Sequence, residues 1–185
     1  MLARTLILVC AVLAAAGPAR AADAEPQYRI GPEDVLEISV WKEEGLRKEV
    51  IVRPDGGISF PLVGEVVAEN RTVEELRTEI AQRLRKLIAD PVVSIAVLKV
   101  ASQRIYVLGR VNRPGEFSTG RYVDVLQALS MAGGLTPFAA ENDIKILRRG
   151  EGKEIALPFR YGDVKSGESL EQNIILRRGD VVLVP

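Results

Sequence analysis

The sequence between residues 105 and 137 limits the fold more than any other stretch of the chain. It opens with the apolar run Ile105 to Leu108, which predicts a buried strand. Gly109 follows, and after four further residues the pair Pro114-Gly115 predicts a turn. The segment therefore begins as a strand followed by a turn, and each of these elements is indicated by its own residue chemistry.

A helix is expected after this turn. Its apolar side chains recur three or four residues apart, as one buried helix face requires: Val125, Leu126, Leu129 and Ala132. Gly133, which Gly134 follows, stands where a helix ends in a left-handed residue, and Pro137 lies just beyond, where the helix cannot resume. A helix cap explains both glycines without any ligand.

Strand patterns also fill the chain before this segment. Residues 35–41 alternate between apolar and polar, which predicts a half-buried strand with Leu36, Ile38 and Val40 on its inner face. After a polar break, residues 49–52 and 58–61 predict a hairpin whose turn is formed by residues 53–57. Residues 63–67 predict one further short strand.

The clearest helix in the sequence follows. Thr72 and Glu75 have the spacing of a capping box and stand directly before apolar residues at helical intervals. We expect the helix to end near Ala89, because Pro91 disfavours helical geometry in the residue before it. Its apolar positions are Val73, Leu76, Ile80, Leu84 and Leu87. Residues 92–98 then predict another strand.

The rest of the chain predicts strands and turns. Residues 144–147 and 154–157 predict a second hairpin, residues 159–173 an irregular polar stretch, and residues 174–176 and 181–185 the last strands. The polar bridge Lys99 to Arg104 is the expected boundary between two modules. The predicted fold class is thus α+β, with small modules at residues 22–100 and 101–185, each formed by a few strands and one helix.

The first 21 residues have the pattern of a secretory signal peptide. Arg4 supplies the positive charge, residues 6–16 the apolar core, and residues 19–21 (ARA) the small-residue cleavage site. Cys10, the single cysteine, lies within the apolar core, preceded by Val9 and without a good lipidation motif. An uncleaved membrane anchor is the alternative, and the shortness of the apolar run favours secretion.

Composition narrows the range of functions. The chain has no histidine and, beyond the signal peptide, no cysteine, which excludes the Ser-His-Asp and Cys-His mechanisms and the usual zinc sites. We therefore predict no catalytic residue, no metal and no cofactor. Twenty-five basic residues balance twenty-five acidic ones, and the aromatic residues are few, so nucleic acid is not an expected partner.

One polar cluster is a candidate contact site. Arg110, Asn112 and Arg113 follow the strand of residues 105–108 and could donate hydrogen bonds to an anionic or hydroxyl-rich ligand, or contact a neighbouring subunit. The stretch has neither the glycine spacing of a dinucleotide loop nor the Gly-Lys-Ser/Thr ending of a P-loop. The alternative is that these side chains form the solvated side of a connection.

Several ordered motifs resemble those of a known family. Residues 28–41 (YRIGPEDVLEISVW), 52–64 (VRPDGGISFPLVG) and 90–95 (DPVVSI) resemble the periplasmic polysaccharide biosynthesis/export domain. Residues 107–115 (VLGRVNRPG), 126–137 and 176–185 (LRRGDVVLVP) are similar to a soluble-ligand-binding β-grasp (SLBB) domain. In this order they resemble the outer-membrane polysaccharide export proteins, in a short form similar to those linked to exosortase systems.

The resemblance implies a non-enzymatic, periplasmic role associated with the outer membrane. Proteins of this family form homo-oligomeric rings that pass polysaccharide outward from an inner-membrane synthesis and export complex. The sequence stops at Pro185 without the C-terminal amphipathic helix of the larger members, so a separate outer-membrane pore protein is an expected partner. The rival interpretation is a monomeric periplasmic carbohydrate-binding or adaptor module, and an enzyme acting on polysaccharide is the third.

Overall fold

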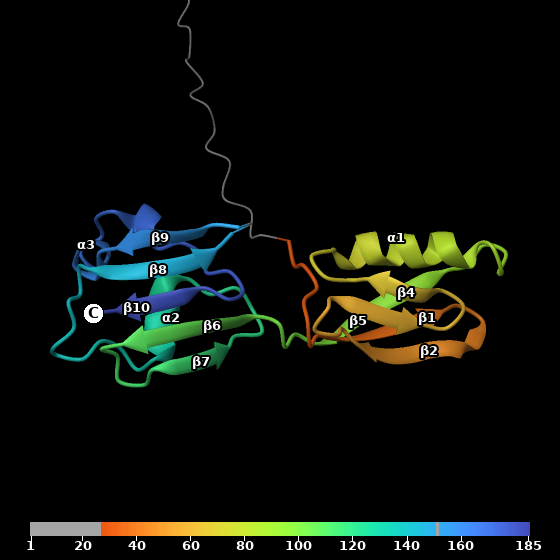
Figure 1. The fold of residues 1–185 in the computed structure, drawn as a ribbon, viewed down its shortest axis with the longest axis horizontal. Coiled ribbons are helices and arrows are strands. Elements are labelled where there is room, and N and C mark those ends of the chain that lie inside the picture. The colour runs from red at the N-terminus through yellow and green to blue at the C-terminus, as the bar shows by residue number, and fades with distance from the viewer. Residues whose placement is uncertain (1–26, 151) are drawn as a thin grey trace, which may run out of the picture.

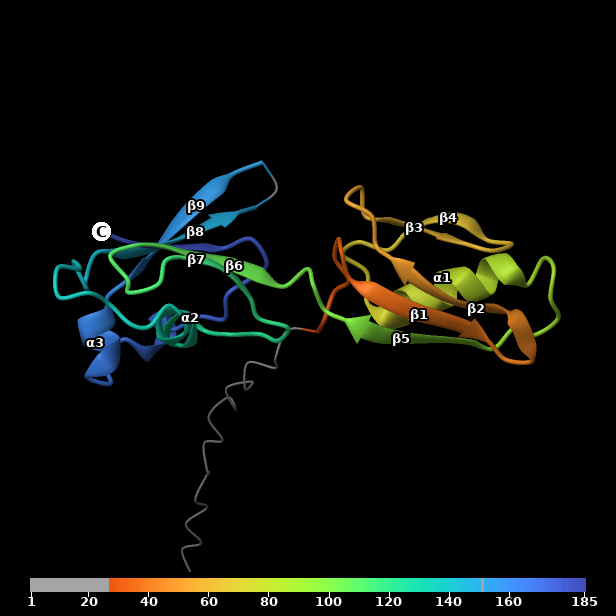
Figure 2. The same ribbon diagram turned by 90° about the horizontal axis from the view of Figure 1, so that it is seen from below.

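The computed structural model describes residues 27–150 and 152–185, which fold into two modules placed end to end (Figures 1 and 2). The predicted signal peptide and Cys10 lie outside the described residues. One module extends to Lys99 and the other begins at Arg104. Each combines antiparallel strands with helical segments, so the predicted α+β class is confirmed.

The first module contains an antiparallel sheet of order β2-β1-β5. Its central strand β1 (Val35–Val40) lies between β2 (Glu43–Ile51) and β5 (Val93–Lys99). The inner face of β1 is buried as the alternation predicts: Leu36, Ile38 and Val40.

The predicted hairpin between residues 49–52 and 58–61 is wrong. The turn exists, because the Arg53 amide donates to the Gly57 carbonyl over 2.9 Å. However, β2 pairs with β1, whereas β3 (Gly57–Phe60) pairs with β4 (Gly64–Val67). The pattern was misleading because β2 is an edge strand with only Leu46 buried, so most of its length has no apolar alternation and resembles a polar break.

Helix α1 (Val73–Leu84) closes the core of the first module. Its capping box is confirmed: the Glu75 amide donates to Thr72 Oγ1 over 3.1 Å, and the Thr72 amide donates to Glu75 Oε2 over 2.8 Å. The helix ends at Leu84, its last buried residue, and not near Ala89. The expected inward position of Leu87 is wrong, since this side chain is 63% exposed beyond the core.

The second module is built on a five-stranded sheet of order β7-β6-β10-β8-β9. These strands are β6 (Arg104–Gly109), β7 (Gly115–Ser118), β8 (Ile144–Arg149), β9 (Glu154–Phe159) and β10 (Val181–Val184). The predicted hairpin of β8 and β9 is confirmed. The last strand, β10, lies at the centre of the sheet, parallel to β6 and antiparallel to β8.

Helical segments lie on one side of this sheet (Figure 2). Helix α2 (Val125–Met131) starts at Asp124 with its own capping box and buries Val125, Ala128 and Leu129. Residues 159–173, predicted to be irregular, contain α3 (Tyr161–Lys165) and the 3₁₀ turn η1 (Leu170–Gln172). The strand predicted at residues 174–176 is only an isolated bridge between Ile175 and Asp124.

Two of the predicted structural glycines have clear physical roles. Gly133 has a φ of 76° and ends α2 in the left-handed conformation, as the sequence predicts. Gly109, with a φ of 95°, ends β6 where a Cβ atom would overlap the carbonyl oxygen of Val184. Glycine therefore allows β6 to approach β10 at this point. Pro114 ends the connection that was predicted as a turn, and Gly115 already begins β7.

Candidate functional site: the groove between the modules

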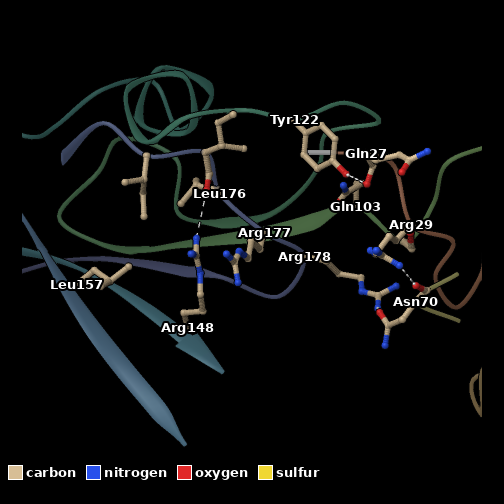
Figure 3. Close-up of a pocket in the computed structure, with 13 residues that line it drawn as sticks. Gln27, Arg29, Asn70, Gln103, Tyr122, Arg148, Leu157, Leu176, Arg177 and Arg178 are labelled. Atoms are coloured by element: carbon tan, nitrogen blue, oxygen red, sulfur yellow. Dashed lines mark hydrogen bonds between the residues drawn. The ribbon is translucent and has the colours of Figure 1, made fainter. Parts of the chain in front are cut away.

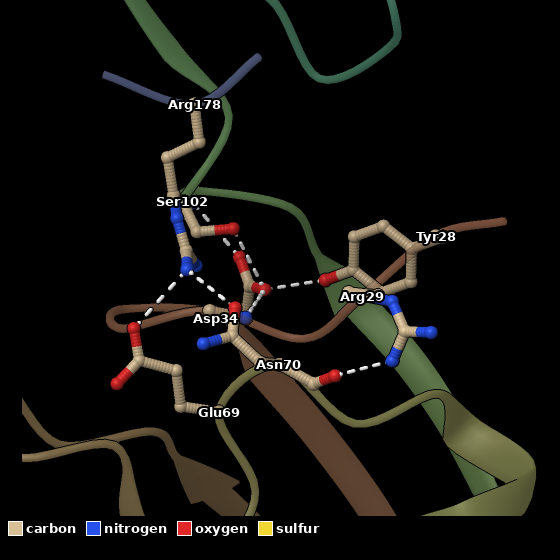
Figure 4. Close-up of polar contacts among 8 residues, drawn as sticks. Tyr28, Arg29, Asp34, Glu69, Asn70, Ser102 and Arg178 are labelled. Atoms are coloured by element: carbon tan, nitrogen blue, oxygen red, sulfur yellow. Dashed lines mark hydrogen bonds and ion pairs between the residues drawn. The ribbon is translucent and has the colours of Figure 1, made fainter. Parts of the chain in front are cut away.

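A buried carboxylate holds the two modules together. Asp34, at the end of the turn before β1, is fully buried and accepts five hydrogen bonds (Figure 4). Its Oδ1 accepts from the backbone amides of Ala101 and Ser102, each over 2.8 Å. Its Oδ2 accepts from the Gly31 amide over 2.7 Å, from Ser102 Oγ over 2.9 Å and from the Tyr28 hydroxyl. The connection between the modules is thus bonded to the first module.

The Tyr28 hydroxyl gives this network a dependence on pH. Burial, together with the hydrogen bond to Asp34, raises the pKa of Tyr28 well above its usual value of 10.0. Above about pH 10 the unfolded chain releases the phenolic proton while the folded chain keeps it, so this group stabilises the fold below that pH and its contribution is lost as the pH rises.

We expect the Tyr28→Phe variant to have a lower free energy of unfolding than the native protein at neutral pH. We also expect it to lack this dependence on pH. Above about pH 10, the free energy of unfolding should fall with pH more steeply for the native chain than for Tyr28→Phe. The two slopes should differ by less than about 1.4 kcal/mol per pH unit, because the phenol is only part-buried. Urea unfolding between about pH 8 and 11 measures the difference. Parallel curves for the two proteins would contradict the role given to Tyr28.

A second buried carboxylate fixes the turn before β10. Asp180 is 1% exposed and forms an ion pair with Arg148, whose Nη2 lies 2.6 Å from Asp180 Oδ2. Arg148 Nη2 also donates to the Ile175 carbonyl over 3.2 Å, and Asp180 Oδ2 accepts from the Arg177 amide over 2.8 Å. Asp34 and Asp180 thus play parallel parts, since each ends a turn and binds the amide three residues before it.

The turn before β10 also contacts the first module. Arg178 Nη2 donates to Glu69 Oε1 and Asn70 Oδ1, both over 3.1 Å (Figure 4). Gly31 makes room for this contact, because a Cβ atom there would overlap Arg178 Nη1 and lie 2.5 Å from the Cβ of Ser102. The modules therefore fit closely at this junction.

A groove of about 760 Å³ opens beside these turns and is lined by residues of both modules, and we call it the junction groove (Figure 3). This volume is within the range of small-ligand sites. Its charged lining consists of four arginines: Arg29, Arg148, Arg177 and Arg178. Among the described residues, no aspartate or glutamate lines the groove. The neutral polar groups that line it are Gln27, Asn70, Ser102, Gln103 and Tyr122.

Three of the four guanidiniums are neutralised by nearby carboxylates: Arg148 by Asp180, Arg178 by Glu69, and Arg29 by Glu75 at 3.6 Å. Arg177 differs from them. Its side chain is exposed and forms no ion pair or hydrogen bond with any other residue that the structure describes. The groove thus presents one uncompensated positive charge beside amide and hydroxyl groups.

The residues predicted as a contact site lie elsewhere. Arg110, Asn112 and Arg113 are exposed in the connection after Gly109, whereas the junction is at the opposite end of β6. Asn112 Nδ2 donates to the Gly133 carbonyl over 2.7 Å, and Arg113 Nη2 donates to the Met131 carbonyl over 3.1 Å. These two side chains therefore satisfy carbonyl groups at the end of α2.

Arg110 differs from its two neighbours, because its guanidinium has no hydrogen-bond or ion-pair partner within the part of the chain that the structure describes. A contact of this loop with a ligand or subunit stays a prediction.

The sequence did not indicate the junction groove, because its walls come from segments far apart in the chain. The sequence Arg177-Arg178-Gly179-Asp180 is typical of a turn and by itself indicates nothing more. Nothing in the sequence places this turn beside Arg29 and Tyr122. Within residues 27–150 and 152–185, no helix combines the length and the apolar character needed to cross a membrane.

Comparisons with known proteins agree on both modules. Residues 22–98 match the family model described as polysaccharide biosynthesis/export protein, and residues 104–158 match the SLBB domain.

Curated proteins are similar in sequence to most of this chain. The EPS I polysaccharide export outer membrane protein EpsA of Ralstonia nicotianae is 31% identical over 182 residues, which cover 85% of this chain and 47% of that protein. The exopolysaccharide production protein ExoF of Rhizobium meliloti is 33% identical over 142 residues, 71% of this chain and 33% of that protein.

The capsule polysaccharide export outer membrane protein CtrA of Neisseria meningitidis serogroup A is 24% identical over 168 residues, 80% of this chain and 42% of that protein. The chain thus spans half the length or less of these relatives.

Proposed function

The chain belongs to the polysaccharide biosynthesis/export protein family, and on that premise we propose that it is a periplasmic, outer-membrane-associated component of exopolysaccharide or capsule export. Copies of it assemble into a ring or conduit through which polysaccharide crosses the envelope, without chemical change to the polymer. Its partners in this proposal are the polysaccharide, an inner-membrane synthesis and export complex, and a separate outer-membrane pore protein.

The observation that carries the proposal is the occurrence of both family domains, in this order, in one closely bonded body. Asp34 binds the connection at Ala101 and Ser102, and Arg178 of the second module binds Glu69 of the first. A subunit with a fixed angle between its domains supports a closed ring, because symmetric closure requires each copy to present the same two surfaces in the same orientation.

Deletion of the gene and measurement of the assembled state test this proposal. We expect the deletion strain to lose surface polysaccharide while synthesis inside the cell continues. We also expect light scattering of the purified protein, and electron microscopy of the complex extracted with its envelope partners, to show a discrete oligomer. Unchanged surface polysaccharide would refute the export role.

A monomer in both preparations would instead favour the carbohydrate-binding or adaptor module. The junction groove favours this second candidate as far as binding is concerned, because amide, hydroxyl and guanidinium groups can bind the hydroxyls of a sugar. A change in polymer length after incubation with the purified protein would identify an enzyme and contradict both candidates.

A further inference from the structure

We propose that the junction groove binds an acidic sugar unit of the polysaccharide, and that the Arg177 guanidinium recognises its carboxylate. This inference rests on the function proposed above, because it names the chemical class of cargo that the groove accepts. It assigns a binding role to Arg177, which is not among the contact residues predicted from the sequence.

The charge of the lining is the first argument. Basic and acidic residues are equal in number over the whole chain, 25 of each, yet the lining has four arginines and no carboxylate among the described residues. Three of these arginines form ion pairs with carboxylates that do not line the groove. One positive charge, that of Arg177, is left to face a ligand, and it suits a ligand with one negative charge per sugar unit.

The anchoring of Arg177 is the second argument. Its amide donates to Asp180 Oδ2 over 2.8 Å, and the Gly179 amide donates to the Arg104 carbonyl over 2.8 Å. The backbone of the turn is therefore held at both sides while the guanidinium stays free. A guanidinium matches a carboxylate with two parallel hydrogen bonds, which a lysine ammonium cannot form.

The remaining lining fits the rest of a sugar ring. Gln103, Asn70 and Tyr122 can exchange hydrogen bonds with hydroxyl groups, and the half-buried Leu157 and Ile174 offer apolar surface to the carbon-bound hydrogens. Figure 3 shows Tyr122 and Leu176 above the row of arginines. Because the groove is open to solvent, the binding is weak, as passage of a long polymer requires.

Isothermal titration of the purified protein with defined oligosaccharides tests the assignment. The probes are oligogalacturonate and oligomannuronate, each compared with its carboxyl-reduced neutral form. We expect the acidic forms to bind more tightly and to lose affinity as salt is added. Arg177→Gln should weaken acidic binding roughly tenfold, the loss of one charge-assisted contact, and weaken neutral binding much less.

Arg85→Gln is the matched control. Arg85 is also exposed, has no side-chain partner among the described residues, and lies at the C-terminal end of α1, away from the groove. The substitution removes the same charge and should not change affinity. Circular dichroism confirms that both variants are folded.

Four results would overturn the assignment. They are equal binding of acidic and neutral probes, no binding of any probe, equal loss of affinity in the two variants, and displacement of the acidic probes by inorganic phosphate at equal concentration, which would indicate a general anion site. None of these results affects the export proposal, which surface polysaccharide in the deletion strain decides separately.

Discussion

Replacement of Asp34 by asparagine is expected to lower the free energy of unfolding by about 3 kcal/mol. The amide would keep the shape of the carboxylate but replace one acceptor oxygen by a donor. If that donor took the place of Oδ1, it would face the amides of Ala101 and Ser102. If it took the place of Oδ2, it would face the amide of Gly31, although the two hydroxyl groups there could turn to accept.

The connection between the modules should loosen at the same time. We expect trypsin to cleave after Arg104 faster in Asp34→Asn than in the native protein, because Ala101 and Ser102 lose their bonds to the carboxylate. Urea unfolding and timed digestion are the measurements.

Asp55→Asn is the control for this change. Asp55 is also a turn residue that accepts from a backbone amide, that of Gly57 over 3.0 Å, but its side chain is 65% exposed. We expect a much smaller loss than for Asp34→Asn, because water screens this exposed carboxylate. Equal losses for Asp34 and Asp55 would show that burial of the carboxylate is unimportant.

Replacement of Asp180 by asparagine is expected to lower the free energy of unfolding by a similar amount, about 3 to 5 kcal/mol. The Arg148 side chain is 12% exposed, so loss of its partner leaves a buried positive charge without compensation. The hydrogen bond from the Arg177 amide to this side chain would also weaken. Thermal or urea unfolding of the purified variant measures the effect.

The neighbouring residue on β8 provides the control. Arg149 forms an ion pair with Glu154 in which the two side chains are 86% and 73% exposed. Because water screens this pair, Glu154→Gln should change the free energy of unfolding by less than about 1 kcal/mol. A larger effect for Glu154 than for Asp180 would contradict the importance given to burial.

Elements with strong local chemistry could be predicted from the sequence. The capping box at Thr72 begins α1, the alternation of residues 35–41 gives the buried face of β1, and Gly133 ends α2. In each case the determining contacts are between residues close together in the chain. The hairpin of β8 and β9 belongs to the same group.

Elements decided by distant contacts could not be predicted. Strand β2 has one buried residue, Leu46, so its pairing is determined by β1 and not by its own pattern. No strand is predicted at β7, because only its pairing with β6 identifies this short segment as a strand. Asp34 and Asp180 stand in sequences typical of turns, which accounts for their bonds to nearby amides but not for those to Ser102 and Arg148.

The close junction between the modules has a mechanical consequence. With Asp34 bonded to Ala101 and Ser102, and Arg178 bonded to Glu69, these contacts oppose rotation of one module relative to the other. The chain then acts as a stiff lever, in which a small tilt at the junction becomes a much larger displacement at either far end.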